Sequence, residues 1–203
     1  MLSEFWAFLQ IGFRHIVAID AADHVLFLLA LAAIYQRRDW RGALWVISAF
    51  TVGHSVTLAL AVTGLLVLPI NIIEFLIPVT IIATGIENLV LRERAASGTT
   101  GKHRPVFAAI FGLVHGAGFA DYLQNLFVDR IALPLLAFNV GIELGQIVVL
   151  VFAAVLFSSV DRLLRALPSV TIRKVNPFQI RLVTVSALVT VVATGWAWER
   201  MPR

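Results

Sequence analysis

The residues best able to do chemistry in this chain are acids and histidines that fall inside long apolar segments. Six of the twelve acids lie within or at the edges of such segments, namely Asp20, Asp23, Glu74, Glu87, Asp121 and Glu143. Four of the five histidines join or flank them, namely His15, His24, His54 and His115. An ionised carboxylate in hydrocarbon must be protonated, paired or bound to a cation. All sixteen lysines and arginines lie outside the apolar segments outlined below, so the sequence predicts that a metal ion or protons supply the missing positive charge.

The spacing of these polar residues groups them on helix faces. Asp20, Asp23 and His24 follow an i, i+3, i+4 pattern and share one face. Glu143 forms a second stripe with Asn139 and Gln146. The chain has no cysteine, and imidazole plus carboxylate without sulfur suits zinc, nickel, cobalt, iron or manganese.

The sequence therefore predicts a divalent metal site and the residues that surround it. The predicted ligands are His15, Asp23, His24, His54, Glu74, His115 and Glu143. The predicted supporting or pathway residues are Asp20, Asn139, Gln146 and Asp121. Nickel, zinc and cobalt remain open as the metal.

Simpler roles compete with this interpretation for several residues. A single histidine in a membrane helix often serves only as a hydrogen-bond partner between helices. His15 can cap the next helix, and His103 lies in a polar loop beside Lys102 and Arg104, where we expect it to be solvated. Glu87 and Asn88 form either a structural pair or an inner gate, and we favour structure. The joint pattern of acids and imidazoles without a base nevertheless favours the metal site.

The elements that must position these residues are membrane helices. The chain is 60% hydrophobic and 14% charged, which is too apolar for a soluble domain of 203 residues. Several apolar runs reach the roughly 20 residues needed to cross a bilayer as a helix. We predict an all-α, polytopic bundle that forms a single domain over residues 1–203, with an interfacial stretch at 3–14. The six predicted helices cover about 16–35, 42–64, 70–91, 105–127, 133–157 and 182–198.

The distribution of basic residues predicts how the bundle is oriented. Twelve lysines and arginines fall in the loops after the first, third and fifth predicted helices, against four on the other side. Since positive loops stay inside, both termini are expected outside, in a bacterial inner membrane. The net charge of +4 is explained by these loops, so we expect no nucleic-acid partner.

Five segments of the chain together resemble one family of bacterial membrane proteins. They are GFRHIVAIDAADHVLFLLAL, SAFTVGHSVTLALAVTG, IEFLIPVTIIATGIENL, FGLVHGAGFA and LAFNVGIELGQ, and they cover about residues 12–150. In this order they are similar to the HupE/UreJ family. The resemblance implies a permease-like protein of six to eight helices, and some members accompany nickel hydrogenases and ureases. It also implies functional roles for His15, Asp23, His24, His115 and Glu143.

The chain resembles one branch of that family more than the other. Seven residues separate His15 from the Asp23–His24 pair, whereas the nickel-permease branch has five. That branch also has a histidine and a glutamate shortly after the histidine that corresponds to His115. Here Phe119 and Ala120 follow instead, so the chain resembles the other large branch.

Three functions are compatible with these observations. The first is a metal permease that works by facilitated diffusion, since the nucleotide-binding pattern GxxxxGK[ST] is absent. The second is a membrane metalloenzyme in which Glu74 or Glu143 is the general base for a histidine-bound zinc, although HExxH is absent. The third is a non-catalytic accessory factor with a structural metal. Expected partners are membrane lipid and the metal ion, with a second copy of the chain and metalloenzyme maturation proteins as candidates.

Overall fold

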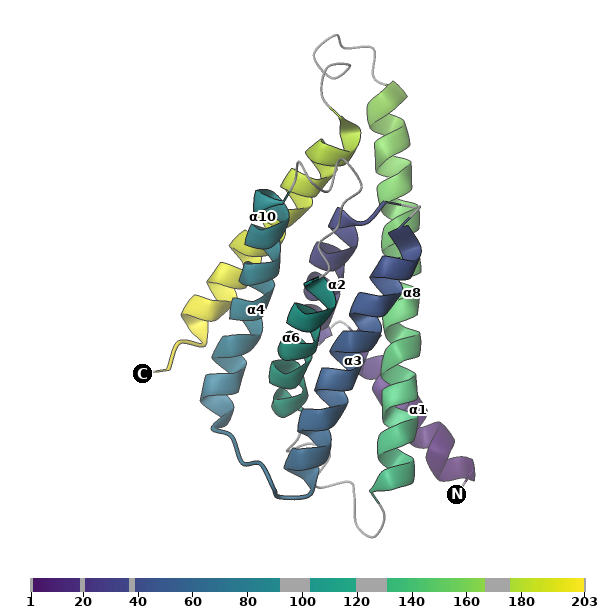
Figure 1. The fold of residues 1–203 in the computed structure, drawn as a ribbon, viewed down its shortest axis with the longest axis vertical. Coiled ribbons are helices and arrows are strands. Elements are labelled where there is room, and N and C mark those ends of the chain that lie inside the picture. Colours follow the sequence, from purple (N-terminus) through teal and green to yellow (C-terminus); the bar gives the residue numbers. More distant parts are fainter. Residues whose placement is uncertain are drawn as a thin grey trace.

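A computed structural model of the protein describes residues 2–18, 21–36, 39–91, 103–119, 131–166 and 176–202. Within these ranges the chain forms seven helices and no strand (Figure 1). The helices are α1 (Leu2–Val17), α2 (Ala22–Ile34), α3 (Trp40–Val62), α4 (Ile70–Val90), α6 (Arg104–Gly118), α8 (Ala132–Ala166) and α10 (Pro177–Glu199).

The helices form the predicted all-α membrane bundle. Four of those described, α3, α4, α8 and α10, are each long and apolar enough to cross a membrane. The pair α1 and α2, which are bent by 66° relative to each other, adds a fifth span if it crosses as one unit. The shorter α6 packs beside α3 and corresponds to the remaining predicted helix.

The prediction of one continuous helix over 16–35 was wrong. The helix α1 already begins at Leu2, and α2 begins only at Ala22. Glycines explain how closely α1 packs against α8. A Cβ atom at Gly12 would collide with the carbonyl oxygen of Phe138 in α8, and one at Gly141 with that of Leu9 in α1. The two backbones therefore touch, as small residues allow between membrane helices.

Two later helix boundaries also differ from the predicted ones. The helix α8 extends to Ala166 rather than about 157, and α10 begins at Pro177 rather than about 182. The start of α10 has a local cause, because the Asn176 side chain accepts a hydrogen bond from the Phe178 backbone N–H and proline occupies the first turn. The described part of α6 ends at Gly118, so the predicted continuation to about 127 falls largely outside the described residues.

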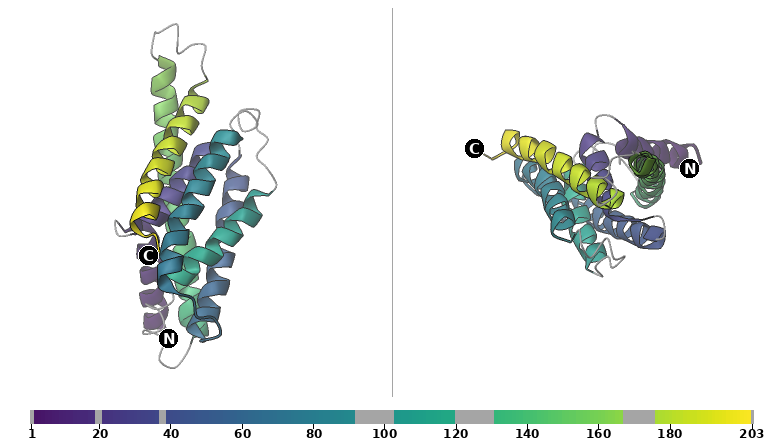
Figure 2. Two further views of the ribbon diagram at one scale, coloured as in Figure 1. Left: turned by 90° about the vertical axis from the view of Figure 1, so that its left-hand side faces the viewer. Right: turned by 90° about the horizontal axis from the view of Figure 1, so that it is seen from above.

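Close helix pairs organise the bundle. The closest contacts join α3 with α6, α1 with α8 and α4 with α10 (Figure 2). In the α3–α6 pair, a Cβ atom at Gly112 or Gly116 would collide with the carbonyl oxygen of Phe50 or His54, respectively. The glycines thus fix how near the histidine-bearing helices come to one another.

Candidate metal centre

Four histidines from four helices meet in the interior of the bundle. His15 comes from the last turn of α1, His24 from the first turn of α2, His54 from α3 and His115 from α6. The ring centroids of His15 and His24 are 4.5 Å apart, and those of His24 and His115 are 5.2 Å apart. His54 completes the group at 6.0 Å from His15 and 6.4 Å from His24. We call these four residues the histidine cluster.

Most of the cluster is buried, and most of its ring nitrogens lack hydrogen-bond partners. His24, His54 and His115 are only 7%, 0% and 1% exposed, and His15 is half-buried. Six of the eight ring nitrogens are buried without a hydrogen bond: Nε2 of His15, both nitrogens of His24 and of His54, and Nδ1 of His115. Buried polar atoms are almost always paired, so such a group of orphaned nitrogens is suited to a bound cation.

A threonine orients one of these rings. The Thr80 Oγ1 lies 3.1 Å from His115 Nε2, and the same hydroxyl donates to the Ile77 carbonyl at 2.7 Å. Because the hydroxyl has only one hydrogen, His115 Nε2–H must donate to Thr80. His115 Nδ1 then carries the free lone pair, which is the arrangement that an outer hydrogen bond gives to a metal-binding histidine.

The spacing of three members is compatible with a metal ion. One ligand atom from each of His15, His24 and His54 lies within 4.8 Å of the other two. Metal–nitrogen bonds of about 2.0–2.1 Å place the ligands of one tetrahedral ion roughly 3.4 Å from one another. Side-chain shifts of up to about an ångström would therefore bring these imidazoles to bonding distance.

Aromatic side chains enclose the cluster. The His15 ring lies 3.9 Å from that of Phe119, and the His54 ring stacks on Phe138 at 6.4 Å. Phe50 lies 5.2 Å from His115 and contacts His54 and His24. These walls give a low-dielectric surrounding, in which interactions with a charge are strong.

Asp23 has a basic partner that the sequence analysis did not foresee. Its Oδ2 atom accepts a hydrogen bond from Arg200 Nη1 at 3.1 Å, while Oδ1 is buried without a hydrogen bond. Arg104 and Arg181 also lie in helices and are only 3% and 7% exposed. The expectation that no basic side chain reaches the spans was therefore wrong, because arginines at or near helix ends fold back onto acids.

Glu74 and Glu143, the remaining predicted ligands, do not join the group of ligand atoms formed by His15, His24 and His54. Glu74 is exposed on α4. Glu143 Oε1 accepts from Ser48 Oγ at 2.6 Å, and the buried Gln146 accepts from Thr51 at 2.9 Å, so both residues join α8 to α3. Asn139 is half-buried with an unpaired Oδ1 atom. The predicted residues Asp20 and Asp121 lie outside the described residues.

A polar network lies at the end of α4 and the start of α6. Arg104 Nη2 donates to Asn88 Oδ1 at 3.0 Å and lies 3.2 Å from Glu87 Oε2. Asn88 Nδ2 donates to the Ala30 carbonyl at 2.6 Å. His103, expected to be solvated, lies 2.7 Å from Glu87 Oε1 and is 46% exposed. The network ties α2, α4 and α6 together, as the structural interpretation of Glu87 and Asn88 expects.

Sequence reasoning missed Thr80, Arg200 and Arg104. Thr80 is one of many threonines in apolar segments, and nothing near it in sequence indicates His115, 35 residues away. Arg200 lies 177 residues from Asp23. Arg104 was the easiest of the three to predict. It lies at the edge of a predicted helix, on the same side of the membrane as Glu87, and this position indicated that the two side chains could pair.

Comparison with known proteins gives one match. A family model described as HupE / UreJ protein matches residues 1–200. No curated protein and no solved structure matches the chain significantly.

Proposed function

The chain belongs to the HupE/UreJ family of membrane proteins, and on that premise we propose that it binds a divalent transition-metal ion and conducts it across the membrane. The histidine cluster is the proposed binding site, and the ion is the cargo. The observation that carries the proposal is the set of six buried ring nitrogens without hydrogen bonds, contributed by four helices.

The donor set narrows the class of metal. Imidazole nitrogens suit zinc, nickel, cobalt and copper, whereas magnesium, calcium and manganese prefer oxygen ligands. No carboxylate among the described residues joins the group of ligand atoms formed by His15, His24 and His54. We therefore favour nickel, cobalt or zinc over magnesium, calcium or manganese. The membrane helices and the basic loops between them support the bacterial inner membrane as the proposed location.

The charge of the site favours passage over permanent retention. Among the described residues the group of ligand atoms contains only imidazoles, which when neutral leave the two positive charges of the ion uncompensated inside an aromatic enclosure. Asp23, the acid adjacent to His24 in sequence, is paired through its Oδ2 atom with Arg200. An uncompensated buried charge is costly, so the ion is held less tightly than in a site with carboxylate ligands. Such a site suits a carrier that must release its cargo.

The same geometry is less favourable to hydrolysis. A metal-dependent hydrolase needs a general base within reach of the metal-bound water. Glu74 is exposed and Glu143 is hydrogen-bonded to Ser48, and neither belongs to the group. The remaining alternative is a structural metal whose four coordination positions are all filled by protein ligands. A flux measurement distinguishes this alternative from the permease.

Flux into liposomes tests the proposal. The wild-type protein and the variant His24→Ala are reconstituted with an internal dye that responds to nickel, cobalt and zinc, and each metal is added outside. We expect dye signal with wild type and loss of most of it with His24→Ala, because one of the clustered ligands is gone. His103→Ala, which removes a histidine outside the cluster, is the matched control and should conduct normally. Bound metal with no wild-type flux would contradict the permease and favour the structural site.

A further inference from the structure

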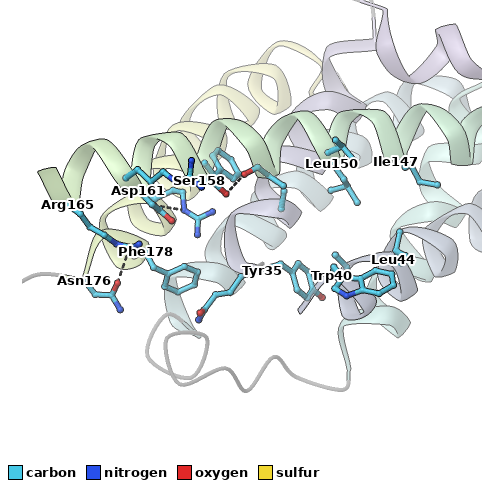
Figure 3. Close-up of a pocket in the computed structure, with 18 residues that line it drawn as sticks. Tyr35, Trp40, Leu44, Ile147, Leu150, Ser158, Asp161, Arg165, Asn176 and Phe178 are labelled. Atoms are coloured by element: carbon cyan, nitrogen blue, oxygen red, sulfur yellow. Dashed lines mark hydrogen bonds and ion pairs between the residues drawn. The ribbon is translucent and has the colours of Figure 1, made fainter. Parts of the chain in front are cut away.

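A separate pocket opens on the side of the bundle where α8 and α10 meet the ends of α2 and α3. It has a volume of about 710 Å³ and shares no residue with the histidine cluster. Figure 3 shows Ile147 and Leu150 at one end of the pocket and Arg165, Asp161 and Asn176 at the other. The pocket is therefore apolar at one end and charged at the other.

The apolar end is built from aliphatic and aromatic side chains. Leu44 of α3 lies across the pocket from Ile147 and Leu150 of α8 (Figure 3), and Val151 also lines the pocket. Tyr35 and Trp40 line the same cavity, and Trp40 is 57% exposed. Tyrosine and tryptophan are enriched where membrane helices pass the lipid headgroups, so this wall suits a molecule that lies at the membrane boundary.

The charged end carries a surplus of arginine. Three arginines and one aspartate line it: Arg162, Arg165, Arg181 and Asp161. Arg181 is held in place by the protein, since its Nε atom lies 3.2 Å from Asp161 Oδ1 and its guanidinium lies 5.0 Å and 5.1 Å from the rings of Phe157 and Phe178. Arg162 and Arg165 are exposed and form no ion pair with a described acid. They are available to an anion.

The length of the pocket wall matches one leaflet of a bilayer. From Ile147 to Arg162 the helix α8 rises by roughly 22 Å, and Arg165 lies about one turn further on. Half of a bilayer, headgroups included, measures about 20–22 Å. A phospholipid whose chain lies on Ile147 and Leu150 thus brings its phosphate near Arg162 and Arg165. The N-terminus of α10, at Asn176 and Pro177, adds a partial positive charge at the same end.

We propose that this pocket binds an anionic phospholipid, with the headgroup phosphate on Arg162 and Arg165 and one acyl chain along α8. Basic pockets between membrane helices on the side of the positive loops favour such lipids. The inference is independent of the metal site and stands whether or not the protein conducts metal.

Native mass spectrometry of the delipidated protein tests the lipid site. Phosphatidylglycerol and phosphatidylcholine with identical acyl chains are titrated, and the lipid adducts are counted. We expect one phosphatidylglycerol to bind roughly ten- to thirtyfold more tightly than phosphatidylcholine, and the double variant Arg162→Gln, Arg165→Gln to remove that preference. Arg14→Gln, which removes an exposed arginine that does not line the pocket, is the matched control and should keep the preference.

A second pair of variants tests the acyl-chain end. Ala154→Trp fills the pocket and should weaken binding of both lipids, whereas Val155→Trp, on the neighbouring exposed face of α8, should not. Equal binding of the two lipids, unchanged by the arginine variants, would overturn the proposal in favour of nonspecific lipid. Displacement by glycerol 3-phosphate at the same concentration as lipid would reduce the site to an anion site. A dimer mass without bound lipid would assign the pocket to a contact between two copies.

Discussion

Thr80 sets the hydrogen-bonding state of His115 and hence which nitrogen faces the cluster. Replacing it, Thr80→Val, removes the acceptor for His115 Nε2–H and frees the ring to adopt the other tautomer. Loss of such an outer hydrogen bond lowers metal affinity by about 10–100-fold, which we expect here. Equilibrium dialysis of the purified protein against nickel or zinc measures the affinity.

Two further variants separate orientation of the ring from simple loss of packing. Thr80→Ser keeps the hydroxyl and should restore most of the affinity. Thr84→Val removes a buried hydroxyl on the same helix that bonds only to the Thr80 carbonyl, so it should leave metal affinity unchanged. If Thr80→Val bound metal as tightly as wild type, His115 would not be a ligand.

At the scale of residues, the sequence indicated which side chains could bind a metal better than it indicated which side chains contact one another. The four histidines could be selected because imidazoles in apolar helices are costly and rare. The metal-ligand roles of Glu74 and Glu143 stay predictions, although the structure leaves both outside the group of clustered ligand atoms. The difference between clustered and distant residues depends on which helix faces meet, and a single sequence taken alone does not contain that information.

The next scale is that of the helices, where glycines determine the spacing between α3 and α6. A Cβ atom at Gly116 would meet the carbonyl, carbonyl carbon and Cα of His54, all of them backbone atoms that cannot turn aside. Gly116→Ala should therefore push α6 away from α3 and destabilise the protein by about 1–3 kcal/mol, the usual effect of overpacking. Thermal unfolding in detergent, with and without metal, measures this loss.

The chain contains its own control for that substitution. Gly195 lies in α10 with no atom within 4 Å of the position of an added Cβ. Gly195→Ala should be neutral or slightly stabilising, since alanine favours the helix by about 1 kcal/mol over glycine. Equal unfolding temperatures for the two variants would show that the α3–α6 contact does not depend on Gly116.

Helix existence could be predicted more securely than helix limits. Apolar length indicated the long helices, because each backbone polar group in lipid must be paired within a helix. The predicted helix limits were wrong where a polar residue lies inside a helix. Arg181 was taken as a boundary, yet it lies buried in α10 because Asp161 of α8 neutralises it. The early start of α1 was missed because its contact with α8 depends on Gly141 and Gly145, which lie far from it in sequence.

At the scale of the whole molecule, the two chain ends lie in the same half of the bundle. Figure 1 shows the labelled N and C ends in the lower half, whereas α2, α4 and α8 all end toward the top. The helix ends that precede the basic segments of the sequence are thus on the side opposite the chain ends, as alternating topology requires. The positive-inside rule then predicts termini on the outer face.

Cysteine labelling tests this orientation cleanly, because the native chain has no cysteine. Ser3→Cys near the start of α1 should react with a membrane-impermeant thiol reagent added to intact spheroplasts. Ser159→Cys, exposed in the last part of α8, should react only after the membrane is permeabilised. The reverse pattern would place the basic loops outside and would reverse the direction in which the cluster faces the cell.

The most direct test of the account is the X-ray absorption spectrum of the protein loaded with one nickel ion per chain. The histidine cluster predicts a first shell of nitrogen at about 2 Å with the outer scattering of three or four imidazoles, and fewer imidazoles in His54→Ala. A shell dominated by carboxylate oxygen, or a spectrum unchanged in His54→Ala, would contradict the assignment of the cluster as the site that holds the ion.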